Sequence, residues 1–337
     1  MTGAAPDVGP PPRFVVGTGR CGSTLLSRML AEHRDVVSLH EVFTGLDWGR
    51  RFAPGLHTGA EVAEILSTPD PVTREALSRG YDAEEVTYPF RPVDRFTRDD
   101  PLPWILVSTL AYLTDDPDDL FDRTVAWLRA RPAAPMADHY RALFAWWTSG
   151  ADGSAWIERS GSSVDYLAEL ADLFPDARFV HIHRDGAEVA LSMREHAMYR
   201  LAVQLTYGVV PDGVDADDTS DEGRDRLITA WLEGSPPVEL YGRYWSDQME
   251  RGAAAAVALP PERLHTVSFE ALVTDPLEHM AAIAGFFGLE EDRGFAERAA
   301  ALVRGVPPTR ADRLDAADRA ALDRSCEPGR AARAATA

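Results

Sequence analysis

The sequence predicts an α/β fold: a single domain with a central, mostly parallel sheet flanked by helices. Two observations indicate this class. Short apolar runs typical of strands alternate with stretches of helical periodicity, and these runs lie at residues 14–16, 35–39, 154–160, 178–183 and 263–269. The first strand also leads through a glycine-rich turn into a helix, an arrangement typical of phosphate sites in such sheets. Strands joined by helices form parallel sheets.

Length and composition set the domain limits and exclude some partners. We assign the domain to residues 13–310 of the 337-residue chain, with a disordered arm at 1–12 and a tail with a frayed end at 311–337. The formal net charge of -20 argues against nucleic acid or an anionic membrane as a partner. The first residues lack the pattern of a signal peptide, and no apolar run approaches the ~18 residues of a membrane span.

Cysteine usage indicates the compartment. Only Cys21 and Cys326 occur, which excludes a disulfide framework and predicts a reducing, cytoplasmic location. We interpret Cys21 as a small packing residue, not as a reactive thiol. The abundance of Ala, Arg, Asp and Gly indicates a GC-rich bacterial source.

The glycine-rich turn at residues 17–22 is the predicted anion site. Its backbone N–H groups and those that open the following helix point toward one place, where the helix dipole also favours negative charge. Ser23 and Thr24 add hydroxyl donors, and Arg20 adds a permanent cation whose fork suits phosphate-like oxygens. The sequence therefore predicts a cradle for a phosphate-like anion.

The turn also matches two other nucleotide motifs. Gly17-x-Gly19-x-x-Gly22 fits the dinucleotide fingerprint, and Glu41 stands about 20 residues on, where an acid that binds ribose is expected. This match keeps an NAD(P)-dependent oxidoreductase open as an alternative, and a non-catalytic nucleotide-binding protein is a further one. The turn also resembles the phosphate loop of NTPases, but Ser23 replaces the essential Lys, so hydrolysis of ATP or GTP is not expected.

The second strand brings a carboxylate to the same sheet edge. It ends at His40 and Glu41, and ligands of open α/β sheets bind beyond the carboxyl ends of the strands. Residues 42–150 follow as a mostly helical insertion over this edge, with helices predicted at 118–130 and 137–148. Its aromatic residues either form core or line an acceptor pocket.

Two later strands end in arginines at this edge. The strand at 154–160 carries Arg159 near its end, and the strand at 178–183 is followed directly by Arg184. Helices are predicted after each of them, at 165–174 and 187–196. Arg184 is a candidate for a second phosphate contact beside the cradle.

The last third of the chain contains one irregular stretch between helices. Residues 208–226 are rich in Gly and Asp and predict a mobile, solvated loop that could act as a lid. Its acids lack the register of an EF-hand, and no His has ligand spacing with Cys or carboxylates, so no metal is expected. Helices are predicted at 227–251 and at 276–287.

Four segments in order resemble the sulfotransferases that use 3′-phosphoadenosine 5′-phosphosulfate (PAPS). Residues 17–26 resemble their 5′-phosphosulfate loop, a P-loop-like element, in the variant of bacterial and tyrosylprotein members. Residues 156–160 resemble the Glu-Lys-Thr/Ser-Pro segment, and 174–193 resemble the 3′-phosphate segment. Residues 268–276 resemble the strand and turn Tyr-Glu-Asp-Leu-x-x-Asp-Pro.

The chain departs from the family's pattern at four positions. Arg159 stands for Lys, Gly161 and Gly186 each stand for Pro, and Arg20 stands where many cytosolic members have Lys. Since Arg is not a proton donor at accessible pH, the resemblance then implies electrostatic stabilisation of the leaving phosphate.

The resemblance implies two binding sites for PAPS. The residues implied for the 5′-phosphosulfate are Gly19, Arg20, Cys21, Gly22, Ser23 and Thr24. Arg184 and Ser192 are implied for the 3′-phosphate. Spacing alone does not select Ser192, which lies two turns into a predicted helix.

The implied reaction is in-line transfer of a sulfuryl group to a hydroxyl of a small-molecule, lipid or carbohydrate acceptor, with release of 3′-phosphoadenosine 5′-phosphate (PAP) and no metal. We expect Glu41 to be the general base, with His40 as its rival. Arg159 is expected to support the sulfuryl oxygens or the acceptor. The sequence leaves the acceptor's identity and the oligomeric state open.

Overall fold

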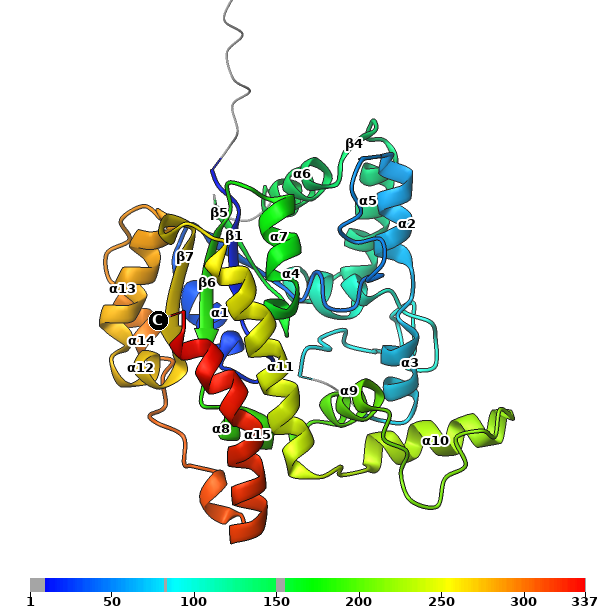
Figure 1. Cartoon of the computed structure of the whole chain (residues 1–337). Coiled ribbons are helices and arrows are strands. Elements are labelled where there is room, and N and C mark those ends of the chain that lie inside the picture. The colour runs from blue at the N-terminus through cyan, green and yellow to red at the C-terminus, as the bar shows by residue number, and fades with distance from the viewer. Residues whose placement is uncertain (1–9, 82–83, 150–154, 337) are drawn as a thin grey trace, which may run out of the picture.

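A five-stranded parallel sheet lies at the centre of the molecule (Figure 1). The computed structural model describes residues 10–81, 84–149 and 155–336. The strand order is β2-β5-β1-β6-β7, and neighbouring strands run parallel throughout, which confirms the predicted fold class. The strands are β1 Arg13–Val16, β2 Val36–His40, β5 Ala155–Arg159, β6 Arg178–His183 and β7 Leu264–Ser268.

Both faces of the sheet are buried, which explains the continuous apolar runs of its strands. Phe14 packs on Phe179 of the neighbouring strand with ring centroids 5.5 Å apart, on one face. Val15 belongs to the core of the opposite face together with Val180. Successive residues of β1 therefore serve two cores, and the centre of the sheet is fixed from both sides.

Helices flank the sheet, and several begin and end where the sequence predicts. The helix predicted at 276–287 starts after the N-cap Asp275, has Pro276 in its first turn and stops at Gly288, whose φ is 63°. The flanking helices are α1 Ser23–Leu30, α7 Leu167–Leu173, α8 Gly186–Arg194, α9 Ala197–Tyr207, α11 Val238–Val257, α12 Phe269–Thr274, α13 Pro276–Phe287 and α14 Phe295–Ala300.

The segment between β2 and β5 lies to one side of the sheet, and its regular elements are mainly helices joined by long irregular stretches (Figure 1). The helices predicted at 118–130 and 137–148 are present within one residue of those limits. The elements are β3 Leu56–His57, α2 Gly59–Ser67, α3 Pro71–Ser78, a π-helical turn at Leu106–Leu110, α4 Ala111–Leu113, α5 Pro117–Arg129, β4 Ala134–Pro135 and α6 Met136–Thr148.

The C-terminal tail is helical, and the prediction of a frayed end is wrong. Residues Ala316–Ala334 form helix α15, which runs beside α11 (Figure 1). Pro328 lies inside α15, where it removes a helical hydrogen bond. The hydroxyl of Ser246 in α11 accepts a bond from Gly329 N (3.1 Å) and donates one to Ser325 O (2.7 Å). This hydroxyl bridges the backbone groups that the proline displaces, so the helix continues.

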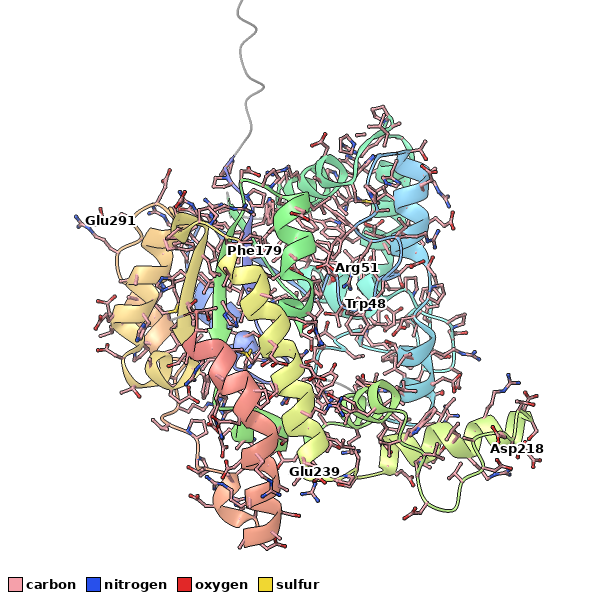
Figure 2. The ribbon with its side chains drawn as sticks, viewed as in Figure 1. Trp48, Arg51, Phe179, Asp218, Glu239 and Glu291 are labelled. Carbon is pink, nitrogen blue, oxygen red and sulfur yellow. The ribbon has the colours of Figure 1, made fainter. Side chains whose placement is uncertain are left out.

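Two further predictions need correction. Helix α10, Asp221–Glu233, begins inside the stretch predicted as a loop, because the side chain of Ser220 caps it. Asp218 lies at the outer end of this projecting part (Figure 2). The single helix predicted at 227–251 is divided between α10 and α11, since prolines at 236 and 237 interrupt the pattern.

The predicted arm at 1–12 lies outside the described residues as far as position 9. Among the described residues, no helix has the length and apolar character to span a membrane.

Candidate active site

The turn between β1 and α1 forms the predicted cradle. Arg20 and Gly22 have left-handed backbones, with φ of 63° and 98°, which fold the chain sharply before α1. Gly17 lies where a Cβ would come within 2.5 Å of the carbonyl oxygen of Ile182, so the turn packs against β6. No side chain caps the start of α1, and its first N–H groups remain available to a ligand.

A polar cavity of about 170 Å³ lies over this turn. It collects cationic side chains from four parts of the chain. Its lining includes Gly19, Arg20, Gly22, Ser23, Thr24, Arg159, Arg184, Ser192 and Arg310. The structure thus brings the residues predicted for both phosphate sites into one cavity, apart from Cys21. The Cys21 thiol is fully buried, and burial raises its pKa, as a packing role requires.

Arg184 lines this cavity from the end of β6, and Ser192 lines it from α8. Ser192 in α8 accepts a hydrogen bond from Arg20 Nε at 3.3 Å. The Arg184 guanidinium lies 4.5 Å from the ring centroid of Phe269. Burial and the nearby charge of Arg310 lower the pKa of Arg184.

Arg310 is a member of the cavity that sequence reasoning missed. It lies between α14 and α15 and shares the carboxylate of Glu188 with Arg184, each at 3.9 Å. Arg310 also pairs with Glu195 at 3.3 Å. Glu41, Glu84 and Glu85 line the cavity as well, so a bound anion would compete with these carboxylates for the four arginines. The segment around Arg310 has no periodicity and no motif, so no sequence pattern marks this residue.

Glu41 occupies a buried turn just after β2. Its carboxylate forms an ion pair with Arg159 and accepts a hydrogen bond from Gly161 N at 2.8 Å and another from the hydroxyl of Thr44. Burial raises the pKa of Glu41, and the charge of Arg159 opposes this only in part. The carboxylate is therefore a stronger base than a carboxylate in water.

His40 differs from its neighbour. Its Nδ1 accepts a hydrogen bond from Arg159 Nη2 at 2.8 Å, and its ring centroid lies 3.8 Å from that of Tyr112. Burial, followed by the charge of Arg159, lowers the pKa of His40 to about 2, so the ring stays neutral. His40 lines neither the polar cavity nor the cavity described next.

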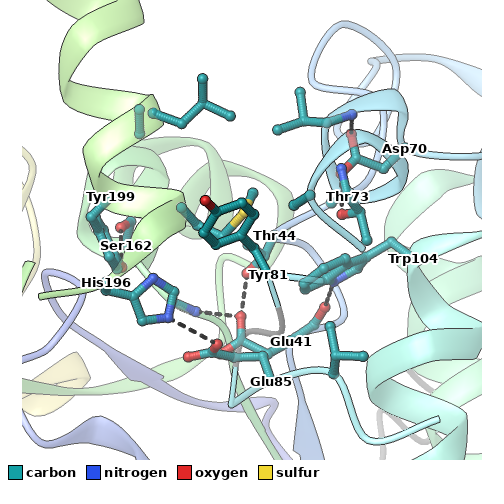
Figure 3. A pocket seen from close by; sticks show the side chains of 18 of the residues that line it. Glu41, Thr44, Asp70, Thr73, Tyr81, Glu85, Trp104, Ser162, His196 and Tyr199 are labelled. Carbon is teal, nitrogen blue, oxygen red and sulfur yellow. Dashed lines mark hydrogen bonds and ion pairs between the residues drawn. The ribbon is translucent and has the colours of Figure 1, made fainter. Parts of the chain in front are cut away.

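A second cavity of about 360 Å³ adjoins the first (Figure 3). Its walls come mainly from α3, α9 and the turn after β2. The apolar and aromatic residues among its lining are Leu46, Trp48, Val72, Ala76, Leu77, Tyr81, Val86, Trp104, Met198, Tyr199, Leu201, Ala202, Leu205 and Tyr244. A large apolar cavity with a few polar groups at one end is typical of a site for a small organic ligand.

The two cavities meet at shared residues. Glu41, Glu85, Gly161 and Tyr199 line both of them. Figure 3 shows Glu41, Glu85 and His196 gathered at one end of the apolar cavity. Glu85 pairs with His196 at 3.7 Å, and this contact lowers the pKa of Glu85 to about 2 although burial alone would raise it. Sequence reasoning missed Glu85 because it lies in an irregular stretch.

Among residues 10–81, 84–149 and 155–336, no group of three His, Cys, Asp or Glu side chains could hold a metal ion.

Comparison with known proteins gives a family match over half of the chain. The model of the sulfotransferase family matches residues 122–293, just over half of the 337 residues. No curated protein sequence matches the chain significantly.

Solved structures with a similar chain path include three sulfotransferases. Sulfotransferase STF9 from Mycobacterium avium is 19% identical, with 97% of this chain and 77% of that chain covered and a TM-score of 0.48. STF1 from Mycobacterium tuberculosis H37Rv is 19% identical, with coverage of 95% and 78% and a TM-score of 0.46. The sulfotransferase domain from the curacin biosynthetic pathway is 14% identical, with coverage of 85% and 76% and a TM-score of 0.47.

Proposed function

The chain belongs to the sulfotransferase family, and from this premise we propose that it transfers a sulfuryl group from PAPS to the hydroxyl of an acceptor, with release of PAP. The observation that carries the proposal is the meeting of two unlike cavities at one carboxylate. One cavity is polar and rich in arginine, and the other is apolar. Glu41 lines both, at the place where donor and acceptor would meet.

The residues of the polar cavity fit a donor with two anionic ends. Arg20, the hydroxyls of Ser23 and Thr24 and the first N–H groups of α1 would hold the 5′-phosphosulfate. Arg184 and Ser192 would hold the 3′-phosphate, together with Arg310. Such a donor would replace the carboxylates that now face these arginines, such as Glu84, whose Oε2 lies 3.3 Å from Arg20.

The proposed step forms a bond between the acceptor oxygen and sulfur and breaks the bond between sulfur and the phosphate oxygen. The acceptor's proton goes to Glu41. A carboxylate has about four lone-pair sites, and Arg159, Thr44 and Gly161 occupy three of those on Glu41, which leaves one for the hydroxyl. The negative charge that develops on the leaving phosphate oxygen is stabilised by Arg20 and by the N–H groups of α1, which are already in place.

The lining of the second cavity favours an apolar acceptor. Its walls offer Trp104, Met198 and Leu201 and similar side chains, which match a phenol or a lipid-like alcohol better than a carbohydrate.

The test is transfer of radioactive sulfur from labelled PAPS. The protein is incubated with a panel of phenols, long-chain alcohols and sugars, and labelled product and PAP are quantified together. We expect equimolar product and PAP with apolar hydroxyl compounds. The proposal would be contradicted if no compound of the panel yielded labelled product or PAP and the protein bound NADH.

A further inference from the structure

The backbone of Glu41 adopts a conformation that is unfavourable for glutamate. Its φ is 55°, in the left-handed region, where a residue with a Cβ is uncommon. Such a conformation is energetically unfavourable and persists only where the surrounding structure enforces it. The contacts of residues 41–43 identify the groups that do so.

The end of β5 holds this turn from one side. Glu41 N donates to the carbonyl of Arg159 at 2.8 Å, which extends the β2–β5 pairing by one residue. Val42 N donates to the buried carboxyl of Glu158 at 3.3 Å. The Ser160 hydroxyl donates to Glu158 at 2.5 Å and accepts from the next backbone N–H, that of residue 43, at 3.0 Å. Three successive N–H groups therefore have partners in residues 158–160, the last two residues of β5 and the residue that follows it.

The insertion holds the same turn from the other side. The indole N–H of Trp104 donates to the carbonyl of Glu41 at 2.5 Å. Arg51 Nη1 donates to the carbonyl of Phe43 at 2.6 Å. The Arg51 guanidinium is buried and lies 3.7 Å from the ring centroid of Trp48 (Figure 2). These carbonyls are thus fixed by side chains that are themselves immobilised by packing.

We propose that Trp104, Glu158 and Ser160 are positioning residues that hold Glu41 in its left-handed conformation, so that its carboxylate stays at the junction of the two cavities. This inference rests on the proposed function, because it concerns the expected general base of that reaction. None of the three hydrogen bonds runs to the Glu41 carboxylate itself; they act through the backbone of residues 41–43.

Glu158 fits this role as a neutral group. It is 1% exposed, and burial raises its pKa to about 8, so at neutral pH it carries a proton. A glutamine at this position keeps the oxygen that accepts from Val42 and Ser160. An alanine removes that acceptor and leaves two buried donors unpaired.

A matched pair of variants separates positioning from general destabilisation. Trp104→Phe removes the bond to the Glu41 carbonyl and keeps most of the ring. Trp147→Phe removes a comparable buried indole bond, 3.0 Å long, to Thr124, and Trp147 lines neither active-site cavity. We expect kcat to fall by about 10- to 100-fold in the first variant only, with the Kd for PAP unchanged in both, because small displacements of reacting groups cost such factors.

Glu158 supplies the second comparison. Glu158→Gln should have the kcat of the wild type. In Glu158→Ala, kcat should fall by the same factor as in Trp104→Phe. Equal kcat values in the Trp104 and Trp147 variants, or equal losses in both Glu158 variants, would overturn the inference.

A crystal structure of Trp104→Phe decides the claim without reference to turnover. We expect Glu41 to leave the left-handed region and its carboxylate to leave Gly161, and an unchanged turn would contradict the inference. A wild-type protein without turnover would count against the proposed function alone, since this structural comparison would still stand.

Discussion

Replacing Glu41 by glutamine tests the proposed base and the charge balance of the site together. Glutamine keeps an oxygen for the bonds from Gly161 and Thr44, but it removes the negative charge that faces Arg159. Both partners of this ion pair are almost fully buried. Removing one partner of a buried pair costs about 3–5 kcal/mol, and the bond that His40 Nδ1 still accepts from Arg159 places the expected loss near the lower end.

The assays for Glu41→Gln are turnover and denaturant unfolding with and without PAP. We expect kcat to fall by about 10²–10⁴-fold, the range for loss of a general base. We also expect the free energy of unfolding to drop by about 3 kcal/mol without ligand. Saturating PAP should restore part of this loss, because it would bring negative charge into the polar cavity that the unpaired Arg159 lines. His40→Asn is the matched control, since it keeps a neutral acceptor for Arg159. Near-normal turnover in Glu41→Gln, with turnover lost in His40→Asn, would refute the assignment.

Three further predictions concern stability and the acceptor. The pKa of Glu158 is raised from 4.5 to about 8, so the free energy of unfolding of the wild type should fall as pH rises through this window. Urea unfolding should show that the free energy of unfolding of Glu158→Gln rises relative to that of the wild type over the same range. Parallel pH curves for the two proteins would contradict the pKa shift. Gly186→Ala should destabilise by about 1–3 kcal/mol, because a Cβ there would lie 2.6 Å from Trp245. Gly285→Ala places its methyl group in open space on α13 and should raise the free energy of unfolding by about 1 kcal/mol. If the two glycine variants changed the free energy of unfolding in the same direction, this reasoning would be contradicted. Ala76→Phe should fill the apolar cavity and raise the acceptor KM by roughly tenfold or more without changing the Kd for PAP; an unchanged KM would exclude the cavity as the acceptor site.

Local patterns predicted the parts of the fold that depend on near neighbours. The cradle needs only a strand, left-handed backbone and a helix start, and these lie within residues 13–30. The helix at 276–287 was bounded correctly because Asp275, Pro276 and Gly288 are standard end signals.

Features that depend on distant partners were not predictable. Helix α15 was missed because Pro328 and Gly329 indicate a break. The hydroxyl of Ser246, which bridges the interrupted backbone groups, comes from α11, far away in the sequence. The order of the strands in the sheet likewise depends on the crossover connections between them, and it cannot be predicted from the sequence of each strand alone.

The same distinction applies to the candidate site. Arg20, Glu41, Arg159 and Arg184 were found because each ends a strand or follows a glycine turn, and parallel strands place such residues at one edge. Arg310 and Glu85 reach the polar cavity from irregular segments, where no periodicity or spacing marks them. Glu41 was preferred to His40 from the sequence alone. That Glu41 lines both cavities and His40 lines neither became visible only in the tertiary structure.

Calorimetric titration with PAP, NADH and ATP tests the central claim most directly. We predict that PAP alone binds and that Arg184→Ala weakens it by about 10- to 100-fold, the worth of a charged hydrogen bond. Arg123→Ala, a control on the surface of α5, should leave PAP binding unchanged. Binding of NADH without any response to PAP would contradict the account and would mean that the turn at residues 17–22 serves a dinucleotide.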